Sequence, residues 1–294
     1  MSVNIPTHFV HQFATAVQLL VQQKKSRFRM AVTEGNYVGK QASPVDQIGT
    51  VNMQPVTTRY APMGRVDAPT DRRWVSPNEF DLPQLIDKFD KLKILTEPES
   101  AYVQTAVQAA NRQYDDLIID AFFGDAKTGE LGATTTSFAT YIVEEDYAAS
   151  ADVGHTVAKL RRAKRFLRAN EVDFDADPIF HAMNAEQEDN LFAESQIIST
   201  DFNDRPVMKE GRMTRFMGAD FIFSERLNTN SDSDRLCPFW AKSGMHLAMW
   251  EDIQTDISRR NDLQGLPWQA YITMSAGATR IEEKKIVQIQ CKEA

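Results

Sequence analysis

The sequence predicts an α+β fold, in which helices and strands occupy different stretches of one chain. Apolar residues recur at helical spacing through residues 96–124, which predicts one long helix. Alternating apolar and polar residues in 268–274 and 287–291 predict strands near the end of the chain. No internal repeat and no low-complexity tail is found, so we expect an ordinary globular protein.

Composition limits the classes of function. The chain has 294 residues and a mass of 33.3 kDa, enough for one large domain or two moderate ones. Apolar residues make up 42% and charged residues 25%, which argues against wholesale disorder. A net charge of -8 argues against a protein that wraps nucleic acid over most of its surface, although a local basic patch remains compatible.

Cysteine usage and hydropathy predict the compartment. Cys237 and Cys291 lie far apart without a Cys-x-x-Cys pair, which favours neither a disulfide framework nor a thiolate metal site and fits a reducing compartment. No run approaches the roughly 18 apolar residues that a membrane span needs. The N-terminus lacks the pattern of a signal peptide. We therefore expect a protein made in a cytosol, with no membrane partner.

The first 23 residues contain no Lys, Arg, Asp or Glu. Phe9 and Phe13 begin an apolar stripe at helical spacing, with Gln side chains on the remaining surface. A surface helix usually carries charge, so this one is expected to pack against something. Two interpretations stay open: a helix on its own domain, or an arm that reaches another subunit.

Residues 24–78 are rich in Gly and Pro and poor in core residues, and Val56, Thr58 and Tyr60 alternate as in a strand. This pattern predicts a projecting two-stranded loop. Residues 24–73 carry nine cations and four anions, a net of +5 that leaves -13 for the rest of the chain. A cationic loop would be attracted to the acidic surface of another copy. The alternative is local pairing with Asp67 and Asp71. The subunit-interface candidates are Arg59, Arg65, Arg72, Arg73, Trp74, Phe9 and Phe13.

The middle of the chain is expected to be mostly helical at first. Residues 82–92 have the pattern of a short amphipathic helix. Thr96 to Glu99 reads as a capping box that starts the long helix, which Gly124 ends. The Gly/Thr-rich stretch 124–136 marks a boundary. Beyond it we expect a helix near 154–169 and extended segments near 178–183 and 219–226.

Catalytic motifs are not found, and neither a cofactor nor a metal site is predicted. There is no phosphate-binding Gly-x-x-x-x-Gly-Lys-Ser/Thr loop, no Gly-x-Ser-x-Gly elbow and no His-Glu-x-x-His. His8 and His11 share a helix face without a third ligand. Asp173, Asp175 and Asp177 alternate as at the start of a calcium loop, but Pro178 follows where a Gly is expected. A solvated acidic turn is the favoured interpretation.

Three further carboxylates lie on the long helix: Asp115, Asp116 and Asp120. Nothing in the sequence places a nucleophile or a base beside them. We interpret them as a solvated or subunit-facing edge, and acid–base catalysis by them is the less favoured alternative.

A run of cations follows in residues 159–168. On a helix they cover most of the surface that Leu160, Ala163 and Leu167 leave free. Without interleaved aromatics, sequence-specific recognition of nucleic acid is not expected. A solvated or salt-bridged helix face is favoured over weak contact with phosphate, for which the candidates are Arg161, Arg162, Lys164 and Arg165.

Three segments, Lys40–Gly49, Thr57–Trp74 and Asp81–Asp90, resemble a family of phage major capsid proteins. The likeness runs on through the Asp115-Asp116 helix to residues 129–137 and, more loosely, into the C-terminal strands. It implies the Hong Kong 97-type capsid fold, with an N-terminal arm, an extended β-hairpin loop, a peripheral domain with a long spine helix, and an axial domain. The implied segments are the arm 1–33, the loop 34–78, the peripheral domain 79–136, the axial domain 137–263 and the returning strands 264–294.

The resemblance also implies a function. Subunits would form pentamers and hexamers of an icosahedral shell around packaged double-stranded DNA, in a virion assembled in the bacterial cytoplasm. About 33 residues precede the loop, too few for a fused scaffolding domain, so a separate scaffolding protein and a portal are expected. Residues for an isopeptide cross-link, known in some members of the fold, cannot be matched. The alternatives are an encapsulin-like compartment, a hydrolase that uses the Asp residues, and a DNA-binding factor that uses 159–168.

Overall fold

The computed structural model describes residues 22–55, 58–59, 64–86, 98–194, 208–209 and 212–293. The chain divides into two compact units. Of the described residues, the first unit contains 22–25, 79–86, 98–112 and 251–275, and the second contains all the others. The predicted arm helix, with Phe9 and Phe13, lies outside the described residues.

A six-stranded mixed sheet is the centre of the second unit, in the order β11-β12-β8-β13-β16-β7. Helix α3 (Val157–Ala169) buries Leu160, Ala163 and Leu167, the apolar positions that the sequence identifies. Thr156 caps its first turn, because the Thr side chain accepts a hydrogen bond from the Lys159 backbone N–H. A second helix, α4 (Ala185–Phe192), follows strand β8. The strands are β7 (Ile142–Val143), β8 (Ile179–Met183), β11 (Arg215–Phe216), β12 (Ala219–Phe223), β13 (Arg235–Ala241) and β16 (Ile286–Cys291).

Three aromatic side chains join distant parts of the second unit. Phe122, near the end of helix α2 (Pro98–Phe123), has its ring centroid 4.6 Å from that of Trp240. Phe28 stacks on Trp240 at 6.0 Å, and the Trp240 indole N–H donates to the Ala31 carbonyl. Phe28 is fully buried, and Ala31 belongs to the 3₁₀ helix η1 (Arg29–Ala31). Phe28, Ala31 and Val32 are therefore core, although the sequence shows little sign of core in this stretch.

A four-stranded sheet has the order β1-β14-β15-β4. Its strands are β1 (Thr33–Asn36), β4 (Asn78–Ile86), β14 (Met245–Arg259) and β15 (Trp268–Arg280). The expected helix over 82–92 is wrong where the structure describes it, because 78–86 form strand β4. Pairing with β15 overrides a local pattern that fits a helix equally well. Residues 87–97, with Thr96 and Glu97 of the predicted capping box, lie outside the described part, and Pro98 and Glu99 begin helix α2.

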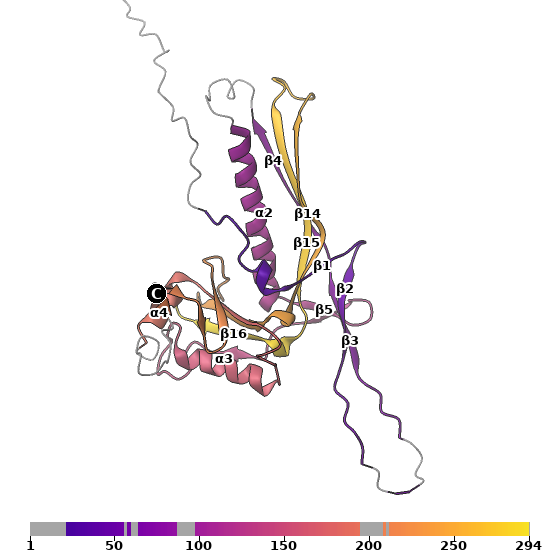
Figure 1. Cartoon of the computed structure of the whole chain (residues 1–294), viewed down its shortest axis with the longest axis vertical. Coiled ribbons are helices and arrows are strands. Elements are labelled where there is room, and N and C mark those ends of the chain that lie inside the picture. The colour runs from indigo at the N-terminus through magenta and orange to yellow at the C-terminus, as the bar shows by residue number, and fades with distance from the viewer. Residues whose placement is uncertain are drawn as a thin grey trace, which may run out of the picture. The chain divides into compact units, whose positions relative to one another are not determined.

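The hairpin strands belong to a third sheet, in the order β2-β3-β5-β6. Strands β2 (Ala42–Ile48) and β3 (Thr70–Val75) are antiparallel and run side by side in Figure 1, with a long connection between them. β5 (Ala126–Thr128) and β6 (Thr134–Thr136) complete the sheet directly after α2. We call β2, β3 and residues 49–69 between them the hairpin.

Several predictions are confirmed by these elements. α2 ends at Phe123, just before Gly124, and α3 lies within the predicted 154–169. β8 and β12 lie in the two predicted extended segments, and β15 and β16 are the expected terminal strands. Short pieces complete the described elements: β9 (Met208–Lys209), β10 (Arg212–Met213), η2 (Lys242–Gly244) and η3 (Glu283–Lys285).

Candidate functional site: the hairpin root and the basic face of α3

Arg280, at the end of β15, connects four segments of the second unit and is fully buried. Its guanidinium donates to the carbonyls of Phe122 (2.9 Å) and Gly124 (2.8 Å) at the end of α2. It also donates to the Thr136 carbonyl at 3.0 Å. A cation here satisfies carbonyls that a helix end leaves without an intrahelical partner. Burial lowers the pKa of Arg280, so charge partners are needed to keep this site stable.

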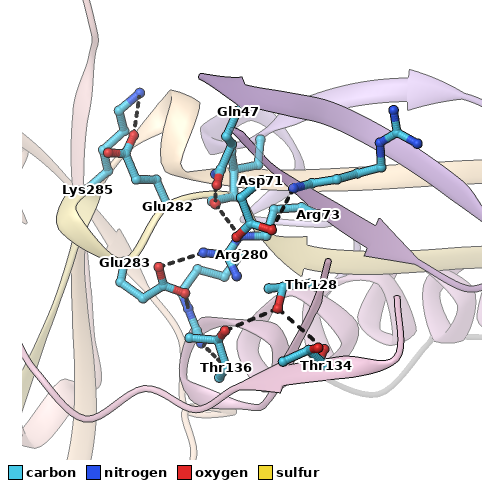
Figure 2. Close-up of polar contacts among 12 residues, drawn as sticks. Gln47, Asp71, Arg73, Thr128, Thr134, Thr136, Arg280, Glu282, Glu283 and Lys285 are labelled. Atoms are coloured by element: carbon cyan, nitrogen blue, oxygen red, sulfur yellow. Dashed lines mark hydrogen bonds and ion pairs between the residues drawn. The ribbon is translucent and has the colours of Figure 1, made fainter. Parts of the chain in front are cut away.

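Glu283 supplies that charge and shares it with a second arginine (Figure 2). Its carboxylate accepts from Arg73 Nη2 at 2.7 Å and from Arg280 Nε at 3.3 Å. Arg73, only 4% exposed, also donates through Nε to the Ile281 carbonyl at 2.8 Å. Because Arg73 belongs to β3, this network fixes the hairpin strands to the end of α2. We call Arg73, Glu283 and Arg280 the hairpin root.

The predicted interface cations of the hairpin are largely paired within the chain. Arg65 pairs with Asp67 at 2.7 Å, as the local alternative expects, and both side chains are exposed. Arg72 pairs with Asp46 across the β2–β3 register, and its guanidinium lies 5.7 Å from the Trp74 ring. The Trp74 indole N–H donates to the Gly129 carbonyl at 2.7 Å. Arg72, Arg73 and Trp74 thus hold the hairpin together, and their roles at a subunit interface stay predictions.

Beyond the root, the hairpin exposes apolar side chains. The described residues between Gly49 and Pro69 form no regular structure, and all but one are exposed. Met53 is fully exposed, and Ile48, Val51 and Val66 are about half exposed or more. Arg59 is exposed as well, and most of the expected strand at 56–60 lies outside the described residues. None of the described residues of this segment is buried.

The exposed cations of α3 differ from those of the hairpin in their partners. We call Arg161, Arg162, Lys164, Arg165 and Arg168 the basic face. Within the described ranges, none of the five forms an ion pair with a carboxylate. Arg162 instead lies 4.4 Å from the Phe166 ring centroid and 5.6 Å from that of Tyr147. Lys164 and Arg168 lie 5.6 and 5.0 Å from the ring centroid of Phe174.

Lys159, the first cation of the run, is not on this face. It is fully buried, and its Nζ donates to the carbonyls of Val153 (2.7 Å) and Gln290 (2.9 Å). The expectation that it covers solvent-facing surface is therefore wrong. The helix turns position 159 towards the sheet, where burial lowers the pKa of the ammonium group.

Two histidines pair beneath the same helix. His155 and His181 are buried, and their Nε2 atoms lie 2.7 Å apart. His181 Nδ1 lies 3.0 Å from the Pro238 carbonyl, which can only accept, so this nitrogen carries the proton. His181 Nε2 is then the acceptor for the proton on His155 Nε2. Burial lowers the pKa of His181 to about 3 and that of His155 well below its ordinary value.

The three carboxylates of α2 have separate structural partners. Asp115 is fully buried and accepts from Ser26 Oγ (2.5 Å), Arg27 N (3.0 Å) and Phe28 N (3.2 Å). The expectation of a solvated or subunit-facing edge is wrong for Asp115, because the chain before η1 folds back over it. Asp116 forms an ion pair with Arg226, and Asp120 accepts from Asn228 Nδ2 at 2.8 Å.

The acidic turn at 173–177 is held by its own backbone and by a neighbour. Asp173 accepts from the backbone N–H groups of Asp175 and Ala176, and Asp177 accepts from both the backbone and the hydroxyl of Ser243.

Among the described residues, no group of three or more His, Cys, Asp or Glu side chains could hold a metal ion. No helix in the described part is long and apolar enough to cross a membrane.

An anchored hairpin with exposed apolar residues is typical of a subunit that completes its packing in an assembly. A model of the family described as phage capsid protein matches residues 5–293. The chain therefore belongs to the phage capsid protein family. Comparison with curated proteins finds no match.

Solved structures share the fold at low sequence identity. The capsid of cyanophage P-SCSP1u is similar with a TM-score of 0.77 at 13% identity, covering 98% of this chain and 94% of that one. The capsid of Ralstonia phage GP4 has a TM-score of 0.73 at 11% identity, covering 100% and 98%. The capsid of a native GTA particle has a TM-score of 0.68 at 12% identity, covering 96% and 95%. The predicted α+β capsid fold is confirmed, and the protein is a major capsid subunit that forms the shell of a virion.

Sequence reasoning missed the residues that hold this structure together. Arg280 and Glu283 stand close together near the C-terminus, where the sequence shows only strand periodicity and a turn. Their partners are more than 140 residues away along the chain, at Thr136 and Arg73. One weak signal is the Arg inside an uncharged strand end, Ala278-Thr279-Arg280-Ile281, since an Arg in such surroundings needs a buried partner.

Proposed function

We propose that this subunit assembles as pentamers and hexamers into a closed icosahedral shell around packaged double-stranded DNA. Assembly takes place in the host cytoplasm around a portal and with a separate scaffolding protein. The hairpin is the extended loop of the proposed segment 34–78, and it docks on a neighbouring copy. The observation that carries the proposal is the contrast between a buried root and an apolar, exposed connection.

The root supports docking because it sets the direction of the hairpin before any partner arrives. Arg73 is held by a carboxylate and a backbone carbonyl, so the root end of β3 is fixed in place within the second unit. A pre-oriented element loses less conformational freedom on binding than a free one. The hairpin therefore acts as a positioned arm of the subunit.

The exposed apolar residues supply the contact. Met53 and Val51 lie in the connection, none of whose described residues is buried, and Ile48 ends β2 just before it. Burying a side chain of this kind contributes about 1.5–3 kcal/mol. A closed shell needs several such patches on each subunit, each interface burying on the order of 1,600 Å² or more in total. The proposed partner is a second copy of the chain, because every subunit carries the same hairpin and the same contact can then repeat around the shell.

The test compares particle yield for two double variants, measured by sedimentation after expression with the scaffolding protein. Val51→Ser with Met53→Ser should leave a soluble, folded subunit that fails to close shells. Val51→Ile with Met53→Leu is the matched control and should assemble, because it keeps the apolar surface. Equal particle yield from both variants would contradict docking through this segment.

A further inference from the structure

The basic face repeats along one side of α3. Arg161, Arg165 and Arg168 are exposed at spacings of four and three residues, so they lie on successive turns. The stripe extends over about 10 Å at 1.5 Å per residue. This local concentration of positive charge contrasts with the net charge of -8 for the whole chain.

Nearby acids do not neutralise this stripe. α3 itself contains no Asp or Glu. Of the carboxylates that follow it in sequence, Asp173 caps its own turn and Asp177 binds Ser243, while Glu171 and Asp175 form no ion pair with α3 among the described residues. Burial and then the charge of Arg168 lower the pKa of Lys164, so these two cations lie within each other's field. An uncompensated positive field attracts a polyanion.

Aromatic rings hold three of the cations without neutralising them. Phe174 lies beside both Lys164 and Arg168, and Phe166 lies beside Arg162. A ring face stabilises a cation but accepts no conventional hydrogen bond, so N–H donors remain for phosphate oxygens. Five cations on one short helix match a phosphate backbone better than they match isolated carboxylates of a protein partner.

We propose that the basic face of α3 binds the phosphates of duplex DNA without sequence preference and forms part of the inner surface of the shell. This inference rests on the proposed function and adds to it the orientation of the subunit. Contacts with phosphate position a protein without reading bases, which suits a surface that meets any packaged sequence.

The first test measures binding of unassembled subunits to a random-sequence duplex against salt concentration. Each phosphate contact contributes about 0.9 to the slope of log K against log salt. Arg161→Gln with Arg165→Gln and Arg168→Gln should reduce that slope by about 2–3 and weaken binding at low salt at least tenfold. The matched control removes three exposed cations that are already paired: Arg65→Gln, Arg215→Gln and Arg260→Gln. It should change the slope little.

The second test uses closed, empty particles and the same added duplex. If α3 faces the interior, particles should bind the duplex far more weakly than unassembled subunits do. Equal binding by particles would place the basic face outside and overturn the proposal. Should the triple variant misfold, Arg165→Gln alone, at an exposed side chain, should still lower the slope by about 0.9.

Particle yield of each variant separates the two proposals. If the triple variant closes shells normally and binds DNA like the parent, the role of α3 is overturned. The proposed function then stays intact. A triple variant that folds but closes no shells would make α3 a contact between subunits and overturn the DNA role. Binding of an acidic scaffolding protein, with no binding of duplex, would also overturn it.

Discussion

The hairpin and α3 carry similar numbers of cations, but the chain treats them in opposite ways. Of the four cations of the hairpin, Arg65, Arg72 and Arg73 pair with carboxylates of the same chain, and Arg59 is exposed. The basic face of α3 forms no ion pair within the described residues. A count of charges along a sequence therefore does not give the charge that is available to a partner.

The difference has a geometric cause. In the hairpin, the antiparallel register puts Arg72 opposite Asp46, and the fold brings Glu283 to Arg73. In α3, positions three and four residues apart hold cations or apolar residues, so the helix offers no partner of its own. Charges of the hairpin stabilise the subunit, and charges of α3 remain for binding.

The largest expected effect tests the hairpin root. Glu283→Gln removes the carboxylate that Arg73 and Arg280 share and should lower the free energy of unfolding by about 3–5 kcal/mol, because both buried cations lose this ion pair. Urea unfolding of unassembled subunits measures this. Asp262→Asn, which breaks the exposed pair with Arg260, is the control and should cost less than about 1 kcal/mol. Similar losses of unfolding free energy in both variants would mean that the root does not anchor the hairpin.

The next effect concerns the buried side of α3. His155 and His181 stay neutral in the folded protein because burial lowers their pKa, while in the unfolded chain they gain protons below about pH 6.5. The stability that neutral His181 contributes is thus complete above about pH 6.5 and is lost as the pH falls towards about 3, by about 1.4 kcal/mol per pH unit, and His155 acts in the same direction. Between pH 7 and 5, His181→Gln should reduce the loss by about 2 kcal/mol in urea unfolding. An unchanged pH dependence would contradict the assignment of a neutral pair.

A smaller loss of stability is expected at Asp115, a buried carboxylate. Asp115→Asn should destabilise the subunit by about 2 kcal/mol, because an amide cannot accept all three hydrogen bonds that the carboxylate receives. Asp116→Asn, at the partly exposed pair with Arg226, should cost less than about 1 kcal/mol. Thermal unfolding of the two variants ranks them, and the reverse order would refute the structural role of Asp115.

The smallest effect is expected at the exposed pair of the hairpin. Arg65→Gln should change the free energy of unfolding by less than about 0.5 kcal/mol, since both partners are exposed and screened by salt. Its influence on particle yield should also be small if Met53 and Val51 provide the contact. A large drop in yield would show instead that the hairpin docks by charge.

Local patterns predict much of the fold. The apolar stripe of α2, its end at Gly124 and the alternation in β15 and β16 are visible in the sequence because each element buries one face. Strand β4 is missed, since its residues also fit a helix and only pairing with β15 decides. Phe28 is missed for a similar reason: its burial depends on Trp240, more than 200 residues away.

The candidate site is predicted only in part. The sequence identifies the cations of the hairpin and of α3, but the carboxylate partners of Arg72 and Arg73 come from register and tertiary packing. Lys159 looks like its neighbours in the sequence, and the phase of the helix alone turns it inward. Which charges pair is a property of the folded chain, and the sequence shows only which charges exist.

The most direct measurement is a cryo-electron microscopy reconstruction of the assembled particle. We expect the hairpin, with Met53 and Val51, to lie against an adjoining subunit, and Arg161, Arg165 and Arg168 to face the interior next to DNA density. A reconstruction with α3 on the outer surface, or with the hairpin folded onto its own subunit, would contradict this expectation.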